Sequence, residues 1–424
     1  MNKLMSHYQY KCASCGMLYK PEDIEQKRIY LCAECGLSEK NRPLRGVLNI
    51  EYDYDSLKIN ILREDFLKLP VGKFWLYPFL WPLNESFIDK FLLSDTARFA
   101  LANEPVNEFR FGENRISVFD DTRNPTFSYK DRATSLVVLK ALEMGITEIA
   151  AASTGNAGSS LAGMCARMGL KAHIFVPKNI PSAKRIQIQA YGANLYLVDG
   201  DYDAAFDLSL EISDQMGWYN RNTAFNPLTI EGKKSAAFDM FIATQGDIPD
   251  IIFVPVGDGV ILSGLFKGFQ ELKQLGWIEN LPHLIGVQAE GSDALVRYMK
   301  KGTFEYRPAK TIADSIHAGA PRNLYMAANA IDRSKGCAVS VSDDEIIDAQ
   351  KLIAKEFGIL TEPAAAAAFA GFKSLRGDCR VPETGRVMIM LTGNGLKDLQ
   401  SLEKWNTSPE IRSVDKWKEF FKSG

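Results

Sequence analysis

Lys130 has the sequence context of a nucleophilic lysine. It lies in residues 124–135, NPTFSYKDRATS, after the apolar run 115–119 and an Asn-Pro turn, and before a periodic stretch, ATSLVVLKALEMG. This order predicts that Lys130 stands where a strand passes into a helix. The positive end of a helix dipole and burial both lower the pKa of an amine. A neutral amine at this position could form a Schiff base with a carbonyl compound.

Four cysteines near the N-terminus have the spacing of a metal site. Cys12, Cys15, Cys32 and Cys35 form two Cys-x-x-Cys pairs separated by 16 residues, and a glycine follows each pair. This spacing is typical of zinc ribbons, and four thiolates would fill a tetrahedral zinc site, so we expect a structural ion. Disulfide pairing is the alternative, and it is less expected in a reducing compartment.

Composition narrows the class of protein. The chain has 424 residues, of which 46% are hydrophobic and 24% charged, and its net charge is −2. These values are ordinary for a globular enzyme and predict neither a nucleic-acid nor a membrane partner. No run approaches the roughly 18 apolar residues of a membrane span. The first residues lack an apolar signal segment, so we expect a cytoplasmic protein.

Strand and helix patterns alternate from residue 115 onward. Short apolar runs at 146–153, 171–177, 193–200, 249–257, 283–291 and 385–393 alternate with helical stretches. This pattern predicts an α/β fold with two doubly wound, mainly parallel sheets, preceded by a small zinc ribbon. We expect the ribbon at 1–40, a large domain at 41–134 and 241–424, and a small inserted α/β domain at 135–240.

Three further loops follow strands and could bind a ligand, because ligands of parallel sheets bind at the carboxyl ends of the strands. STGNAGSS (153–160) offers backbone amides and hydroxyls to a carboxylate, PVGDGVILSG (255–264) has glycines that could wrap a phosphate, and LTGNGLKD (391–398) presents Thr392. Asp258 brings a negative charge to the second loop, which is unexpected in an anion site.

Together, these four loops resemble those of the threonine synthase family among the fold type II pyridoxal-phosphate-dependent enzymes. The resemblance covers roughly residues 110–400, and some family members also carry an N-terminal cysteine ribbon. It implies that Lys130 is the catalytic lysine that binds the cofactor and that Asn156 contacts the cofactor hydroxyl. The residues it assigns to the cofactor are Lys130, Asn156, Gly257, Asp258, Gly259, Val260, Ile261, Leu262 and Thr392. It assigns Ser153, Thr154, Gly155 and the position of Thr229 to the substrate.

The family reaction converts O-phospho-L-homoserine and water to L-threonine and phosphate, so the resemblance implies a phosphorylated amino-acid substrate, pyridoxal phosphate and structural zinc. It also implies a homodimer. A neutral Thr392 beside the ring nitrogen favours elimination or replacement over transamination.

Four positions depart from the family pattern. An arginine that binds substrate phosphate is replaced by Thr229, a glycine by Phe127, a histidine by Asn394, and the segment before the lysine strand is barely recognisable in LANEPV (101–106). We expect Phe127 to add bulk beside the lysine. Other cations could bind the phosphate; the candidates are Lys184, Arg185, Arg221, Lys233 and Lys234.

These departures leave two other functions open. One is a pyridoxal-phosphate enzyme with another substrate, such as cysteate-synthase-like replacement on O-phosphoserine, or a threonine or diaminopropionate ammonia-lyase. The other is a non-catalytic regulatory or zinc-dependent interaction protein, which the presence of Lys130, Asn156 and Thr392 disfavours.

Overall fold

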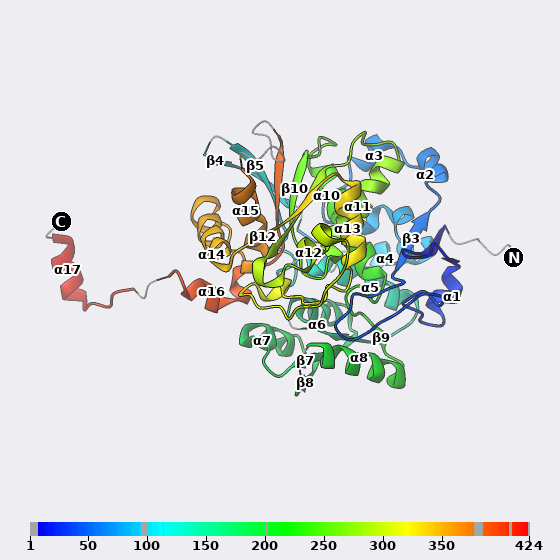
Figure 1. Ribbon diagram of the computed structural model, residues 1–424, viewed down its shortest axis with the longest axis horizontal. Helices are drawn as coiled ribbons and strands as arrows, with labels where there is room; N and C mark the ends of the chain where they lie inside the picture. Colours follow the sequence, from blue (N-terminus) through cyan, green and yellow to red (C-terminus); the bar gives the residue numbers. More distant parts are fainter. Residues whose placement is uncertain are drawn as a thin grey trace.

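Three β-sheets organise the chain (Figure 1). The computed structural model describes residues 7–94, 101–102, 104–112, 114–153, 155–200, 202–376, 385–406 and 409–422. The predicted α/β fold with mainly parallel sheets is confirmed, and each of the six apolar runs forms a strand.

The largest sheet has six strands in the order β12-β11-β10-β13-β5-β4. All neighbours are parallel except β4 and β5, which form an antiparallel hairpin at one edge. The strands are β4 (Val106–Phe111), β5 (Asn114–Asp120), β10 (Ile251–Pro255), β11 (His283–Ala289), β12 (Cys337–Val341) and β13 (Val387–Leu391).

Helices cover both faces of this sheet (Figure 1). Along β10, Ile251 and Phe253 pack into one buried cluster, while Ile252 and Val254 pack into another. Alternate residues of a strand point to opposite faces, so both faces are buried, as expected of a doubly wound sheet. The helices are α5 (Lys130–Glu143), α10 (Ser235–Ala243), α11 (Val260–Gln274), α12 (Ala294–Lys301), α13 (Leu324–Arg333), α14 (Asp343–Leu352), α15 (Pro363–Leu375) and α16 (Leu399–Glu403).

The second sheet is parallel and has four strands in the order β8-β7-β6-β9. Its strands are β6 (Glu148–Ala152), β7 (Lys171–Pro177), β8 (Asn194–Val198) and β9 (Tyr219–Asn220), and the helices that follow in sequence are α6 (Asn156–Met168), α7 (Ser182–Ala190), α8 (Tyr202–Met216) and α9 (Leu228–Glu231). The loop that follows β6 therefore leads directly into α6.

The N-terminal sheet is antiparallel and packs on helices that lead to the other two sheets. Glu25 of α1 pairs with Lys140 of α5 at 2.8 Å, and the Tyr52 hydroxyl donates to Glu231 at 2.7 Å. The elements here are β1 (Tyr8–Cys12), β2 (Leu18–Tyr19), α1 (Pro21–Glu25) and β3 (Leu48–Tyr52), followed by α2 (Tyr54–Asn60), α3 (Arg63–Phe66) and α4 (Glu85–Ser94). The sheet therefore extends to Tyr52, and the domain boundaries expected from the sequence stay a prediction.

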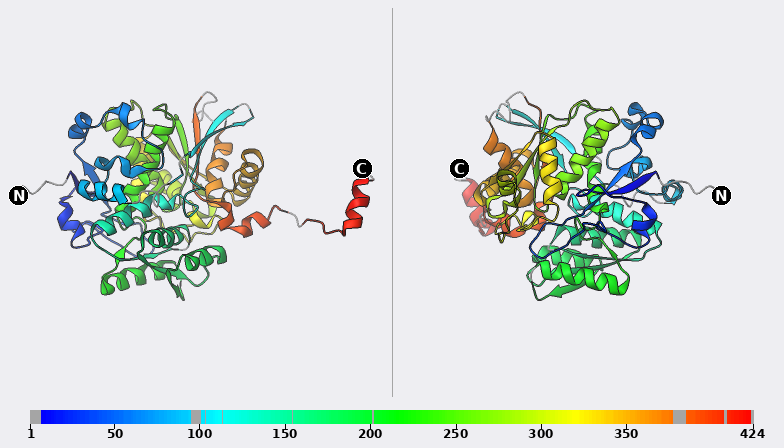
Figure 2. Two further views of the ribbon diagram at one scale, coloured as in Figure 1. Left: turned by 180° about the vertical axis from the view of Figure 1, so that it is seen from behind. Right: turned by 45° about the vertical axis from the view of Figure 1, so that its right-hand side comes forward.

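Two further segments, residues 74–83 and the C-terminal helix, lie outside the three sheets. The apolar segment 74–83 includes the fully buried Trp81, whose indole donates to the carbonyl of Phe74 at 2.7 Å. The C-terminal helix α17 (Val414–Lys422) extends away from the rest of the molecule, as Figure 2 shows. No helix in the described part of the chain is long and apolar enough to cross a membrane.

A buried ion-pair cluster fixes the start of α5. Arg132 is fully buried and donates to Asp121, which follows β5, at 2.6 and 2.8 Å, and to Asp239 of α10 at 2.6 Å. Its partner Asp121 accepts both bonds from one guanidinium, which is the strongest arginine–carboxylate geometry. The first turn of α5 is therefore tied to the sheet and to a second helix.

We expect Asp121→Asn to lower the free energy of unfolding by about 3–5 kcal/mol, because it leaves the buried Arg132 charge partly uncompensated. Urea denaturation would measure this loss. The control is Glu108→Gln, which breaks the exposed ion pair of Glu108 with Arg115 and should cost less than about 1 kcal/mol. Equal effects of the two variants would contradict the structural role of the buried cluster.

Candidate active site

Three helices begin around one cavity at the carboxyl ends of the strands. α5 begins at Lys130, α6 at Asn156 and α11 at Val260, and the cavity between these residues has a volume of about 300 Å³. Helix N-termini present free N–H groups and partial positive charge. The arrangement suits an anionic ligand of small-molecule size.

Most of the residues that the sequence assigned to a ligand line this cavity: Lys130, Ser153, Gly155, Asn156, Gly257, Asp258, Gly259, Val260, Ile261 and Thr392. Leu262 is fully buried in α11 and does not line it. Thr229 is fully buried as well, and its hydroxyl donates to the carbonyl of Asn226 at 2.7 Å. Thr154 lies outside the described residues.

Each residue of the Lys-Asp-Arg sequence has a separate environment. Lys130 faces the cavity, and desolvation lowers the pKa of its amine; nearby Asp258 opposes this shift, and Arg221 adds to it. Asp131 accepts hydrogen bonds from the backbone of Thr126 at 2.7 Å and from Ser160 of α6 at 2.6 Å. Together with Arg132, it fixes the turn that presents the Lys130 amine.

Ser153 and Asn156 organise the loop between β6 and α6. The Ser153 hydroxyl accepts hydrogen bonds from the N–H groups of Gly155 at 3.0 Å and Gly158 at 2.8 Å, so it holds the first turn of the helix. The Asn156 amide donates to Glu362 at 2.8 Å and to Ser315 at 3.0 Å. Its carbonyl oxygen is buried without a partner among the described residues, so an acceptor remains for a ligand hydroxyl.

The glycine loop before α11 is closely packed. A Cβ on Gly257 would lie 2.8 Å from the Cα of Ile316, and one on Gly259 would lie 2.8 Å from the Cβ of Ala327. Gly259 also has a φ of +84°, which side chains disfavour. The Asp258 carboxylate accepts the N–H of Arg322 at 3.1 Å, which explains how an acid is accommodated beside an anion-binding loop.

Thr392 lies at the end of β13 and lines the cavity with little exposure to solvent. Its carbonyl accepts the N–H of Tyr129 at 2.9 Å, so it is directly connected to the residue before Lys130. The adjacent Lys397 points elsewhere: its amine donates to Thr126 at 2.9 Å and Ser159 at 2.8 Å. The last predicted loop therefore contributes one hydroxyl to the cavity and one cation to the structure around it.

The cavity wall contains residues that the sequence analysis did not identify. Glu362, just before α15, is 2% exposed and receives hydrogen bonds from Asn156 and Ser315. Asp314 pairs with Lys184 of α7 at 2.6 Å and so connects the segment over the cavity to the smaller sheet. The only sequence signal for Glu362 was its place before a proline-initiated helix. Asp314 and Ser315 lie in a loop, and no sequence motif indicated a role for either of them.

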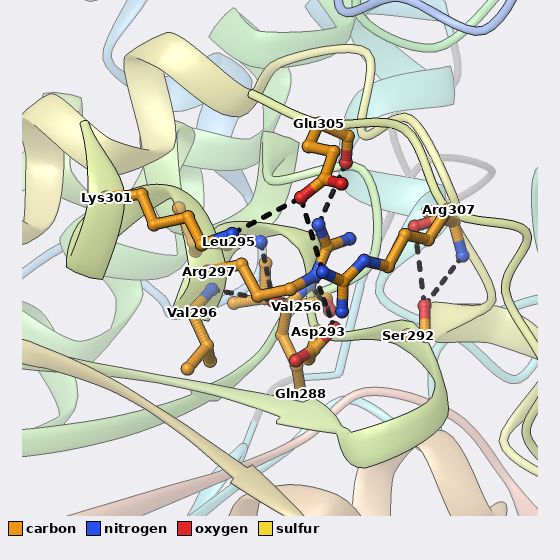
Figure 3. A network of polar contacts seen from close by, with 11 residues as sticks. Val256, Gln288, Ser292, Asp293, Leu295, Val296, Arg297, Lys301, Glu305 and Arg307 are labelled. Carbon is orange, nitrogen blue, oxygen red and sulfur yellow. Dashed lines mark hydrogen bonds and ion pairs between the residues drawn. The ribbon is translucent and has the colours of Figure 1, made fainter. Parts of the chain in front are cut away.

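A segment that follows α12 forms one side of the cavity, from Tyr306 through Ala320. Figure 3 shows the polar contacts that hold it. Arg297 donates to Asp293 at 2.8 Å and to the carbonyl of Glu305 at 2.8 Å, and the Ser292 hydroxyl donates to the carbonyl of Ile316 at 2.9 Å. Because one of these bonds holds Glu305, just before the segment, and another holds Ile316 within it, they fix its path along the cavity.

Phe127 behaves differently from the expectation that it adds bulk beside Lys130. Its side chain is 47% exposed and does not line the cavity. Its φ is +68°, a conformation that glycine adopts with least strain, so the backbone at this position keeps a glycine-like shape despite the larger residue. The substitution changes the surface of the protein and leaves the lysine pocket unfilled.

The four N-terminal cysteines form a second candidate site. Their sulfur atoms all lie within 4.8 Å of one another, with Cys12 and Cys35 at 3.4 Å and Cys15 and Cys32 at 3.7 Å. None of the four forms a disulfide in this structure. Four sulfurs at these distances are compatible with tetrahedral zinc.

Comparison with known proteins agrees with the geometry of the cavity. The family model "Pyridoxal-phosphate dependent enzyme" matches residues 105–393. Threonine synthase of Methanocaldococcus jannaschii is 34% identical over 92% of each chain, and that of Methanosarcina acetivorans is 33% identical over 93% of each. Among solved structures, a threonine deaminase from T.th. has a TM-score of 0.61 at 20% identity, covering 76% of this chain and 98% of its own.

The fold and the matched segment place this chain among the pyridoxal-phosphate-dependent enzymes of fold type II. Within them it belongs to the threonine synthase family, because the match to curated members extends over nearly the whole of both chains.

The residues at the cavity fit pyridoxal phosphate. The buried Asn156 oxygen without a partner is available to a ring hydroxyl, and at Gly257 and Gly259 no Cβ could be added without displacing neighbouring atoms. A lysine with a lowered pKa and a helix N-terminus complete the donor set that a phosphorylated aldehyde requires.

We expect Gly259→Ala to weaken pyridoxal phosphate binding about tenfold or more, a loss of about 1.4 kcal/mol, because its Cβ would displace Ala327 and the loop. Titration of the cofactor-free protein, followed by visible absorbance, would measure the dissociation constant. Gly145→Ala is the matched control: its φ is also positive, at +69°, but nothing lies within 4 Å of the added Cβ. It should lose stability and retain affinity, and equal weakening in both variants would contradict the steric explanation.

Proposed function

We propose that this protein converts O-phospho-L-homoserine and water to L-threonine and phosphate. The observation that carries the proposal is the similarity to threonine synthases over more than nine-tenths of both chains. The set of residues around the cavity supports the same reaction class, since it combines a lysine of lowered pKa with an anion-binding helix start.

In this proposal the residues of the chain have distinct roles. Lys130 would hold the cofactor aldehyde, and its amine would also be placed to move protons at the substrate Cα and Cβ. The first turn of α6, with the N–H groups that Ser153 organises, would bind the substrate carboxylate. Asn156 would orient the ring hydroxyl, and the loop 257–261 would hold the cofactor phosphate.

Pyridoxal phosphate, when bound, supplies an electron sink that stabilises negative charge at the substrate carbon atoms. Thr392 bears on how strong that sink is. A hydroxyl beside the ring nitrogen leaves the ring less electron-poor than a carboxylate would, and this favours loss of a γ-substituent over transamination. Glu362 would hold the donor side of the Asn156 amide, so that its carbonyl oxygen stays directed to the ligand.

The alternatives left open by the sequence receive less support. The curated relatives that cover nearly all of this chain are threonine synthases, whereas the deaminases and racemases share the fold at 18–22% identity. Such a likeness supports the architecture and carries no choice of substrate.

The test is product analysis of the cofactor-loaded protein with O-phosphohomoserine and, in parallel, O-phosphoserine. We expect threonine and phosphate in equal amounts from the first compound and no phosphate release from the second. Lys130→Ala should abolish turnover and the visible absorbance of the lysine-linked cofactor, because Lys130 is the only lysine among the described residues that line the cavity. Turnover of O-phosphoserine alone would contradict the proposed substrate.

We also propose that the four N-terminal cysteines bind one structural zinc ion. Metal analysis of the purified protein should find about one zinc per chain, and Cys35→Ser should lower both the zinc content and the melting temperature. Cys337→Ser, which changes a cysteine outside the cluster, is the control and should retain the zinc. A zinc content near zero in the unmodified protein would contradict the proposal.

Two expectations from the sequence, a homodimer and a cytoplasmic location, stay predictions. The exposed apolar side chains of Phe127, Leu396 and Leu399, which the structure places on neighbouring segments, are compatible with a subunit interface. Free clustered thiols are compatible with a reducing compartment.

A further inference from the structure

Arg221 and Lys233 differ from most other buried cations in the described part of the chain; Lys397 also lacks a carboxylate partner, but two oxygen atoms accept hydrogen bonds from its amine. Most of those side chains form ion pairs with carboxylates: Arg132, Lys140, Lys184, Lys234 and Lys267. Arg221 and Lys233 are both fully buried, and neither forms an ion pair with any described residue. Burying a charge without a partner is costly, so these two side chains are candidates to bind an anionic ligand.

The contacts of Arg221 direct it to the cavity wall. Its Nε donates to Thr134 of α5 at 3.3 Å, its Nη1 donates to the Thr223 hydroxyl at 2.9 Å, and its Nη2 is buried without a partner among the described residues. Thr223 itself lines the cavity. Because the Thr223 oxygen already accepts from Arg221, its hydroxyl hydrogen is available to an acceptor inside the cavity.

Lys233 is a second fully buried cation, and it does not itself line the cavity. Its ammonium donates to the carbonyl of Thr229 at 2.9 Å, and this is its one acceptor among the described residues. Desolvation and the charges of Lys130 and Arg221 lower the pKa of the Lys233 amine, and the Asp258 carboxylate opposes this shift. Lys233 therefore shares the electrostatic surroundings of Lys130 and Arg221, and an ammonium can donate more bonds than the single one observed.

We infer that Arg221 and Lys233 provide the positive charge for the substrate's phosphate group and act on it through the Thr223 hydroxyl. The inference rests on the proposed function for the identity of the phosphate ester. Thr223 would contact the phosphate, while Arg221 orients that hydroxyl and Lys233 adds charge behind it. Thr229, whose position in the family carries an arginine, here supplies only the carbonyl that fixes Lys233 one helical turn later.

A second phosphate, that of the cofactor, could also use this charge. The glycine loop and the N-terminus of α11 already provide a separate backbone cradle for an anion. The wall at Thr223 is formed by a different segment, which precedes α9. Because the glycine loop already supplies backbone donors for one phosphate, we assign the side-chain charges to the substrate's phosphate, and the experiment distinguishes the two.

The experiment compares Arg221→Gln, Arg221→Lys, Lys233→Met and Thr223→Val with the unmodified cofactor-loaded protein. For Arg221→Gln we expect the KM for O-phosphohomoserine and the inhibition constant of inorganic phosphate to rise roughly tenfold or more, as for loss of a charged hydrogen bond. Arg221→Lys should retain most of the affinity because it keeps the charge. The dissociation constant of pyridoxal phosphate should change less than about threefold.

Thermal unfolding separates this role from a structural one. Lys233→Met and Arg221→Gln should melt at the same temperature as the unmodified protein or higher, since each removes an uncompensated buried charge. Arg115→Gln, which changes an exposed arginine at the β4–β5 hairpin, is the control and should alter neither phosphate affinity nor KM. Lower melting temperatures with unchanged phosphate inhibition would overturn the inference.

Two other outcomes would overturn it differently. A weakened affinity for pyridoxal phosphate with unchanged phosphate inhibition would assign the charges to the cofactor. Unchanged affinities in the Arg221 variants and a large change in Arg322→Gln would move the phosphate to the other arginine at the cavity. If the unmodified protein makes no threonine, the proposed function fails, while thermal stabilisation by inorganic phosphate, compared between the unmodified protein and Arg221→Gln, still tests the charge cluster.

Discussion

The fixed position of the first turn of α5 is the constraint on which the rest of the site depends. Lys130 can serve as a neutral nucleophile only if its helix start is held against a cavity from which water is largely excluded. Arg132 provides that restraint, because its buried guanidinium joins Asp121 at the end of β5 to Asp239 of α10. Asp131 adds a connection to α6 through Ser160. One turn of helix is thereby connected to both large sheets.

Charge is distributed unevenly around this turn. Most buried cations have carboxylate partners and stabilise the fold, whereas Arg221 and Lys233 have none among the described residues, and Arg221 donates to Thr223 at the cavity wall. The pKa of the Lys130 amine is also lowered. Desolvation is the largest cause of this shift, and the charge of Arg221 adds to it. A fold that retains uncompensated charge at one wall gives up stability there, which is a common property of functional sites.

The departures from the family pattern have different structural meanings. Phe127 keeps the backbone conformation that glycine favours and turns its ring to solvent, so the lysine pocket is unaffected. Thr229 is fully buried, and its hydroxyl donates to Asn226 in the same turn. No guanidinium is present at this position, and the positive charge nearby belongs to other residues such as Lys233. Residue identity at one aligned position therefore says little until the neighbouring charges are known.

The sequence by itself determined the strand and helix pattern, the four loops and their order, because hydrophobic periodicity and turn residues are local properties. It also determined the cysteine cluster, whose spacing is short. Only the tertiary structure decided which residues meet: Glu362 with Asn156, Asp314 with Lys184, and Arg221 with Thr223. These partners are separated in the chain by 206, 130 and 2 residues. Even for Arg221 and Thr223, which are close in sequence, the informative property is that Arg221 is buried without a carboxylate partner among the described residues. That property depends on tertiary packing and cannot be read from local sequence.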